Sequence, residues 1–149
     1  MAEYLAVAEQ NILLNQAAVL TASIPCKKGN IFFENETGIL ILRGNTTGCF
    51  ARYEVDFQAN VALTEGGTPG PIALAIAVNG EARQSSLAIS TPSAAEEYNS
   101  VSGSAIIDVP RGCCFSVSLR HVPGTDDPTA TPAPVITAKN INVRVIRKA

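Results

Sequence analysis

Apolar and polar side chains alternate between residues 51 and 61. The odd positions in this stretch are apolar, and the even positions carry Arg, Glu, Asp, Gln and Asn. Successive side chains of a pleated strand point to opposite faces, so the alternation predicts a half-buried strand with one face in water. Tyr53, Val55 and Phe57 are therefore expected in the core.

A second strand is predicted over residues 72–78, after a stretch rich in Gly and Pro. Its even positions are large aliphatic residues that we expect in the core: Ile72, Leu74 and Ile76. Its odd positions are small: Ala73, Ala75 and Ala77. Small side chains let another layer or subunit approach closely, so this face is a candidate subunit interface. Asn79-Gly80 then favours a hairpin, because both residues tolerate left-handed backbone conformations.

The same pattern of apolar segments separated by turn residues continues downstream. Residues 105–109 and 114–120 predict two strands joined as a hairpin by Pro110-Arg111-Gly112. The expected inward side chains of the second strand are Phe115, Val117 and Leu119. Residues 122–134 are rich in Pro, Thr and Asp, a composition typical of a long exposed loop, and the last strand is predicted over residues 141–146.

Two upstream segments are less regular. Residues 39–42 are continuously apolar between Gly38 and Gly44, which predicts a strand buried on both faces, at the centre of the fold or at a subunit contact. Leu40 and Leu42 are therefore further interface candidates. Residues 1–20 contain helix-favouring Ala, Leu, Glu and Gln, yet their apolar positions also allow two short strands, which we favour over a helix.

Many short strands separated by Gly, Pro and Asn turns predict an all-β antiparallel sandwich or jelly roll. The length of 149 residues fits a single domain spanning residues 1–149. No internal repeat of fixed period suggests a propeller or a solenoid.

Composition narrows the function classes. Hydrophobic residues make up 46% of the chain and charged residues 16%, with 11 Lys and Arg against 13 Asp and Glu and a net charge of -2. This balance lacks the basic field that nucleic acids or anionic membranes require. No apolar run approaches the roughly 20 residues of a bilayer helix, and no secretory signal is visible, so we expect a soluble protein made in a cytoplasm.

Cysteine is the most suggestive residue type, at Cys26, Cys49, Cys113 and Cys114. The spacing lacks the paired Cys-x-x-Cys arrangement of structural zinc sites, so no metal site is expected. Adjacent side chains of a strand point to opposite faces, so one of the 113–114 pair is expected in the core. A disulfide between Cys26 and Cys49, or between either and the 113–114 pair, is an alternative in an oxidising environment.

Candidate catalytic chemistry is sparse. His121 is the single histidine and is interpreted as a surface residue at the edge of the 122–134 loop. No nucleophile elbow, Cys-His-Asn set or phosphate-binding glycine loop is present, so we assign no catalytic residue and no cofactor. The acidic pairs Glu96-Glu97 and Asp126-Asp127 are interpreted as solvated loop residues rather than as calcium ligands.

The order of these features resembles a known jelly roll. A Thr-Gly entry at 37–38 precedes an apolar strand, a long alternating strand follows, and the segments Val78-Asn79-Gly80-Glu81, Ser102-Gly103-Ser104-Ala105 and Asp108-Val109-Pro110-Arg111-Gly112 come later. This arrangement is similar to the tumour necrosis factor and complement globular-head superfamily. The resemblance implies a homotrimer in which one sheet of each subunit packs about the axis.

Four shorter phrases, at 37–44, 49–53, 70–76 and 108–114, resemble short proteins encoded by phages and prophages of gut Gram-positive bacteria. That resemblance implies a non-enzymatic virion component, assembled in the bacterial cytoplasm as a capsid decoration or a head-fibre trimer, with a capsid or other virion protein as its partner.

Two alternative functions stay open at this point. One is a ligand-recognition module that binds a host glycan or receptor through exposed loops at 64–71, 82–99 and 122–134, because loops on a rigid sandwich commonly carry binding. The other is a bacterial spore-surface protein. Neither alternative requires an enzyme, a nucleic acid or a membrane.

Overall fold

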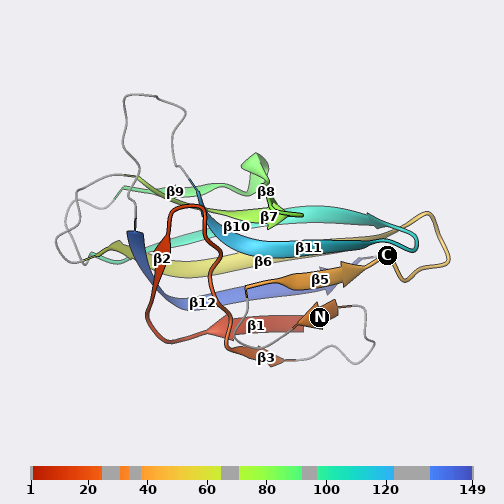
Figure 1. Ribbon diagram of the computed structural model, residues 1–149, viewed down its shortest axis with the longest axis horizontal. Helices are drawn as coiled ribbons and strands as arrows, with labels where there is room; N and C mark the ends of the chain where they lie inside the picture. The colour runs from red at the N-terminus through yellow and green to blue at the C-terminus, as the bar shows by residue number, and fades with distance from the viewer. Residues whose placement is uncertain are drawn as a thin grey trace.

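The computed structural model describes residues 2–24, 31–33, 38–64, 71–91, 97–122 and 135–148, which form two antiparallel sheets stacked as a sandwich (Figure 1). The only helix within these ranges is the short 3-10 turn η1 (Gln84–Ser86). Among the described residues, no helix has the length and hydropathy needed to cross a bilayer. Cys26 and the acidic residues Glu96, Asp126 and Asp127 lie outside the described ranges.

Sheet A contains the longest strands. Its strand order is β10 (Asn99–Pro110), β6 (Phe50–Leu63), β12 (Val135–Arg147), β1 (Ala2–Ala6) and β3 (Ala22–Ile24), with β2 (Gln10–Leu13) also paired to β12. The alternating segment predicted at 51–61 is the centre of β6, and its even positions face outward from the sandwich. Residues 2–6 and 10–13 thus form two short strands in this sheet and not a helix.

Sheet B packs against sheet A. Its strand order is β4 (Ile31–Phe33), β5 (Leu40–Arg43), β11 (Cys114–Val122), β7 (Ile72–Val78) and β8 (Glu81–Ala82), with β9 (Ala88–Ser90) also paired to β7. The Asn79-Gly80 turn between β7 and β8 has φ values of 53° and 84°, the left-handed conformations that its sequence predicts.

The hydrophobic core lies between the two sheets. All but one of the expected core residues are buried there: Tyr53, Val55, Phe57, Ile72, Leu74, Ile76, Val117 and Leu119. Phe115 is partly buried and packs against the same cluster. The aliphatic and aromatic side chains of alternate positions therefore meet across the sandwich, as period-two patterning requires.

The predicted hairpin between residues 105–109 and 114–120 is wrong. β10 pairs with β6 in sheet A, whereas β11 lies between β5 and β7 in sheet B, so the turn at 110–113 connects the two sheets. The physical reason is that both strands find longer partners elsewhere: twelve residues of β10 pair with β6. Local turn chemistry predicts that the chain reverses, and not which strand it then pairs with.

The expectation that Leu40 and Leu42 form a subunit interface is also wrong. Both side chains point into the core and are 1% and 0% exposed. Their neighbour Ile39 is 51% exposed, so the apolar run is buried on one face only. A continuous apolar run therefore overstates the burial of β5, which crosses sheet B with one face towards solvent.

The alanines of β7 are buried by their own chain. Ala73 and Ala75 form a small cluster with Val122 on the outer side of sheet B, and Ala82 and Leu87 pack against it. Ala77 is likewise fully buried, and pairs with Ala82 in β8. The small residues do allow a close approach, and the side chains that approach belong to Ala82 of β8 and to Leu87, which follows η1 in the same chain.

The N-terminal segment links the two sheets. β2 pairs with β12 in sheet A, and the chain then crosses so that Ala17 forms a bridge with Arg120 of β11 in sheet B. The backbone N–H of Ala18 donates to the Leu119 carbonyl at 2.8 Å, and that of His121 donates to the Gln16 carbonyl at 2.9 Å. We call residues 10–18 the N-terminal crossover.

Candidate functional site

The outer face of sheet A carries a polar hollow of about 560 Å³. Its charged row crosses four neighbouring strands, because Glu3 of β1 is in register with Arg144 of β12, Arg144 with Asp56 of β6, and Asp56 with Ser104 of β10. The adjacent row contributes Asn142, Gln58 and Ser102. The hollow therefore presents carboxylate, guanidinium, amide and hydroxyl groups from strands that are distant in sequence.

Side-chain size explains the depression. On the outer face of β10 the side chains are the short Ser102 and Ser104, whereas β12 contributes the longer Asn142 and Arg144. The Nδ2 of Asn142 donates to Glu3 Oε1, which holds one wall in place. A β-bulge between Lys139 and Asn142, with Asn140 at φ 53°, bends β12 next to the hollow.

The chemistry of the hollow is that of polar recognition. Two carboxylates, Glu3 and Asp56, flank the single guanidinium of Arg144, and the remaining groups donate or accept neutral hydrogen bonds. The lining residues include serines but no histidine that could act as their base. The arrangement suits either a hydroxyl-rich ligand or the polar part of a second protein surface.

An exposed apolar residue adjoins this polar area. Ile106 lies two positions along β10 from Ser104 on the same face and is 57% exposed. It stands opposite Glu54 of β6. An open sheet face that mixes a large apolar side chain with hydrogen-bonding groups is typical of a surface that contacts another protein.

The three described cysteines lie at the surface, and Cys26, the fourth candidate for the alternative disulfide, lies outside the described residues. Cys49, Cys113 and Cys114 are all exposed and free, so neither member of the 113–114 pair is a core residue. The reason is that Cys113 lies in the turn before β11, and Cys114 stands at the very start of that strand, beyond the end of the core. Among the described residues, no group of three or more His, Cys, Asp or Glu side chains is arranged to hold a metal ion.

The interpretation of His121 as a surface residue is wrong, because its side chain is buried. It is 0% exposed and lies on the inward face of β11 together with Val117 and Leu119. The N-terminal crossover covers it. Its Nδ1 lies 3.2 Å from the Ile12 carbonyl, and its Nε2 has no hydrogen-bond partner in the part of the chain that the structure describes. Burial lowers the pKa of His121 below 6.5, despite the opposing backbone hydrogen bonds.

Sequence reasoning found part of the hollow. The alternation in residues 51–61 placed Asp56 and Gln58 on the wet face, but nothing local connected them with Glu3, Arg144 or the serines of β10. Of the three loops proposed for ligand binding, 64–71 and 122–134 fall almost entirely outside the described residues. The loop proposed at 82–99 is described except for 92–96, and it contains the end of β8, η1 and β9.

Comparison with solved structures places this fold. The chain is similar to the globular domain of zebrafish complement 1qA, with a TM-score of 0.59 and 14% identity over 99% of this chain and 98% of that one. It is also similar to the Eiger tumour necrosis factor of S. frugiperda, with a TM-score of 0.62 and 10% identity over 100% and 92% of the two chains. Murine APRIL matches with a TM-score of 0.55 and 12% identity over 96% and 97%.

The chain has the jelly-roll fold of the complement 1q and tumour necrosis factor proteins. No family model and no curated protein sequence matches it. The likeness to these structures concerns architecture, because at 10–14% identity it carries no site residue from one protein to the other.

Proposed function

We propose that the protein is a non-enzymatic structural domain that works as a homotrimer, with its subunits meeting through the outer face of sheet A. The observation that carries this proposal is the contrast between the two outer faces. The chain itself buries Ala73 and Ala75 on sheet B, whereas sheet A leaves Ile106 and the polar hollow open. Of the two, sheet A is the face with room for another subunit.

The fold supports the same proposal. The jelly roll is shared over nearly the whole chain with complement 1q and tumour necrosis factor structures, and the sequence resemblance to that superfamily implies trimers built from one sheet of each subunit. Three equivalent copies can close about an axis without leaving an unpaired contact surface.

A virion location is the finer part of the proposal. It is supported by the resemblance of residues 37–44, 49–53, 70–76 and 108–114 to short phage-encoded proteins. In this setting the trimer decorates a capsid or forms the head of a small fibre, where stable assembly rather than catalysis is the requirement.

The test compares two exposed isoleucines on opposite sheets. Ile106 of β10 lies on the outer face of sheet A, and Ile89 of β9 is 51% exposed on sheet B. Sedimentation velocity at micromolar concentration is expected to show a trimer for the wild type and for Ile89→Asp, and smaller species for Ile106→Asp. A monomeric wild type, or equal dissociation of both variants, would contradict the proposal.

The polar hollow favours a second candidate, recognition of a hydroxyl-rich ligand such as a sugar. A volume of about 560 Å³ falls within the range of small-molecule sites, and hydrogen-bonding groups line it. Glycan-array binding that Ser104→Trp abolishes, with the hydrodynamic size unchanged, would support this candidate over the trimer interface. A wild type that binds no glycan on the array would contradict it.

A further inference from the structure

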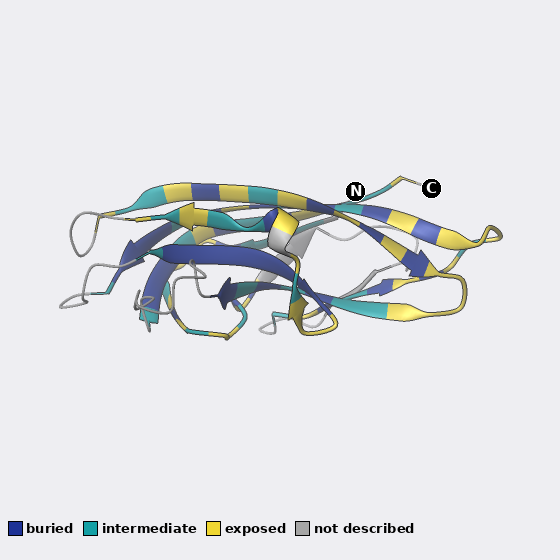
Figure 2. Ribbon diagram, turned by 90° about the horizontal axis from the view of Figure 1, so that it is seen from above, coloured by how far each residue is buried: buried dark blue, intermediate teal, exposed yellow. Residues whose placement is uncertain are grey.

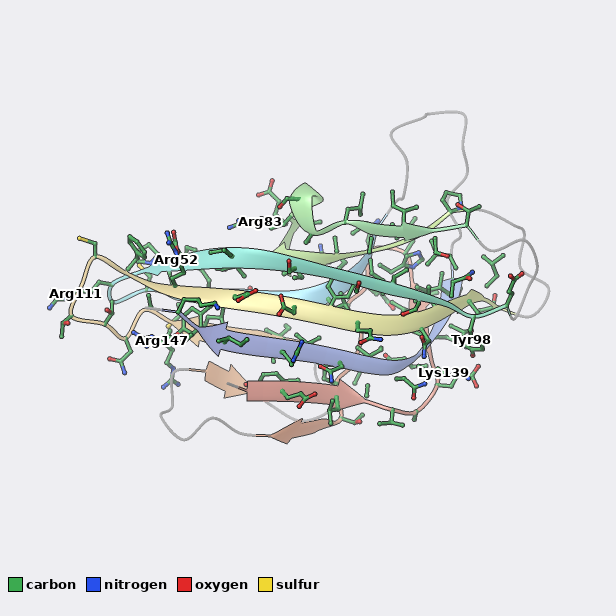
Figure 3. The ribbon with its side chains drawn as sticks, turned by 180° about the vertical axis from the view of Figure 1, so that it is seen from behind. Arg52, Arg83, Tyr98, Arg111, Lys139 and Arg147 are labelled. Atoms are coloured by element: carbon green, nitrogen blue, oxygen red, sulfur yellow. The ribbon has the colours of Figure 1, made fainter. Side chains whose placement is uncertain are left out.

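One end of the sandwich gathers basic side chains. Figure 3 shows Arg52, Arg111 and Arg147 together at that end, with Tyr98 and Lys139 at the other. We call residues 43–54, 108–114 and 147–148 the basic tip. It contains the turn between β5 and β6, the turn between β10 and β11, and the end of β12. Two of the phrases singled out in the sequence, at 49–53 and 108–114, meet in it.

The two turns of the basic tip are tied together through their backbones. The N–H of Gly44 donates to the Cys113 carbonyl at 2.8 Å, and the N–H of Gly112 donates to the Gly44 carbonyl at 3.1 Å. The N–H of Arg111 donates to the Cys49 carbonyl at 3.0 Å. A Cβ on Gly44 would lie only 2.0 Å from the Pro110 carbonyl oxygen, so the close approach requires glycine. The tip is therefore a preorganised surface.

The basic tip is positively charged, whereas the rest of the chain is negatively charged. The basic tip holds five cationic side chains, Arg43, Arg52, Arg111, Arg147 and Lys148, against the carboxylates of Glu54 and Asp108. This gives the tip a formal charge of +3 in a chain whose total is -2, which leaves -5 on the remainder. Charge of one sign concentrated at one end attracts an anionic partner to that end.

Both carboxylates of the tip are already engaged. Arg52 donates to the two oxygens of Asp108 at 2.8 and 3.0 Å, which holds the pKa of that carboxyl below its usual value. Lys148 lies 2.9 Å from Glu54. Arg111 is exposed at the end of the turn and forms no hydrogen bond or ion pair with the side chains of the described residues. Its guanidinium is available to bind a carboxylate or sulfate in a bidentate manner.

An aromatic ring and loop hydroxyls accompany the charges. Phe50 is 41% exposed, with the guanidinium of Arg52 lying 5.1 Å from its ring centroid. The adjacent turn carries Thr46 and Thr47, of which Thr47 is exposed. A ring face, hydroxyl groups and cations in one small area match the ring faces, hydroxyls and acidic groups of a charged sugar.

We propose that the basic tip binds an acidic polysaccharide through its carboxylate or sulfate groups. Nucleic acid fits less well: a duplex carries one negative charge per roughly 1.7 Å, so its continuation beyond the tip would face the -5 of the remainder. Arg52, Glu54 and Asp108 lie at one end of the outer face of sheet A, whereas Arg111 lies in the turn beyond the strands. The binding test therefore uses Arg111, and the oligomeric state of each variant is measured beside it.

The binding test uses polygalacturonate and dextran sulfate as probes, with neutral dextran and polyglutamate as comparisons, in calorimetric titrations at low and moderate salt. We expect both acidic polysaccharides to bind, more weakly as salt rises, and neutral dextran not to bind. Arg111→Gln is expected to weaken binding roughly threefold to fivefold. Lys139→Gln, which removes the same charge at the opposite end, should leave binding unchanged.

The exposed thiols allow an independent test of charge at the same place. In a Cys26→Ser background, iodoacetate alkylates Cys49, Cys113 and Cys114: each thiolate sulfur forms a bond to carbon, iodide leaves, and one negative charge is added. Iodoacetamide forms the same bond and adds no charge. Three carboxymethyl groups cancel the +3 of the tip, so iodoacetate is expected to abolish binding and iodoacetamide to preserve it.

The possible outcomes test the role of charge and the class of the ligand separately. Loss of polysaccharide binding after iodoacetate but not after iodoacetamide supports the proposal. Equal loss of binding with both reagents overturns the role of charge. Binding of neutral dextran, or of polyglutamate as tightly as the polysaccharides, overturns the assignment of the ligand class, as does the absence of binding to any probe. A monomeric wild type in sedimentation would contradict the trimer while leaving every one of these readouts intact.

Discussion

Strands β6 and β7 show how differently the two sheets use their apolar residues. Along β6, buried residues alternate with partly or fully exposed ones as far as residue 60. In β7 all seven residues are buried, and Figure 2 shows this strand in uniform dark blue. The outer face of β6 is open, but that of β7 is covered by Ala82 and Leu87 from the following segment. The burial of β7 on two faces therefore reflects cover by the same chain, and for this reason the proposed trimer uses the open outer face of sheet A.

The strongest test of this contrast is a charge on the covered face. Ala75→Glu places an unpaired carboxylate at a position that is 0% exposed, so we expect a loss of about 5 kcal/mol or more in the free energy of unfolding. Urea denaturation measures it. Gln58→Glu, on the open face of β6, is the matched control and should change stability by less than about 0.5 kcal/mol. A stable, folded Ala75→Glu trimer would show that the face is not covered as described.

A core truncation in sheet A tests the other side of the comparison. Tyr53 is 0% exposed, and its hydroxyl donates to the Arg43 carbonyl at 2.6 Å. Tyr53→Ala is expected to cost about 3 to 5 kcal/mol and Tyr53→Phe about 1 kcal/mol, which separates packing from the hydrogen bond. Equal midpoints of chemical unfolding for the wild type and Tyr53→Ala would mean that the inward face of β6 is misassigned.

The stability of the protein should depend on pH through His121, which lies under the N-terminal crossover between the sheets. The pKa of His121 is lowered by burial, so the unfolded chain takes up a proton first as the pH falls. Stability is thus fully present above pH 6.5 and declines below it, by at most about 1.4 kcal/mol per pH unit until the native group titrates. Unfolding midpoints from pH 8 to pH 5 measure the slope. His121→Leu should remove this component, and a variant with the wild-type slope would exclude His121 as its origin.

The smallest expected effect lies in the turn that begins the covering segment. Gly80 has φ 84°, and no atom lies within 4 Å of a Cβ built there. Gly80→Ala therefore meets backbone strain without a clash, and we expect a loss of about 1 kcal/mol. Thermal unfolding of this variant beside Gly48→Ala, a surface glycine without a positive φ, isolates the conformational cost. Equal melting of the two variants would argue against a strained turn.

Local pattern predicted the elements better than their partners. The alternation through Phe57, the apolar face of β7 and the Asn79-Gly80 turn are present as their residue types require. The hairpin after Pro110 was wrong, because a turn sequence encodes a reversal but not the sheet that receives the next strand. His121 was misplaced for a related reason, since its cover comes from residues more than a hundred positions earlier in the chain.

The candidate sites show the same division. Residue order alone placed Asp56 and Gln58 on a solvent-facing side, because period two is a property of a single strand. Only the pairing of β1, β12, β6 and β10 brought Glu3, Arg144 and Ser104 beside them, and only the meeting of two turns gathered the charges of the basic tip. The sequence by itself determined an all-β chain with defined inner faces, because side-chain alternation is local. The tertiary structure decided which outer face is covered and which charges converge, because both depend on contacts between segments far apart along the chain.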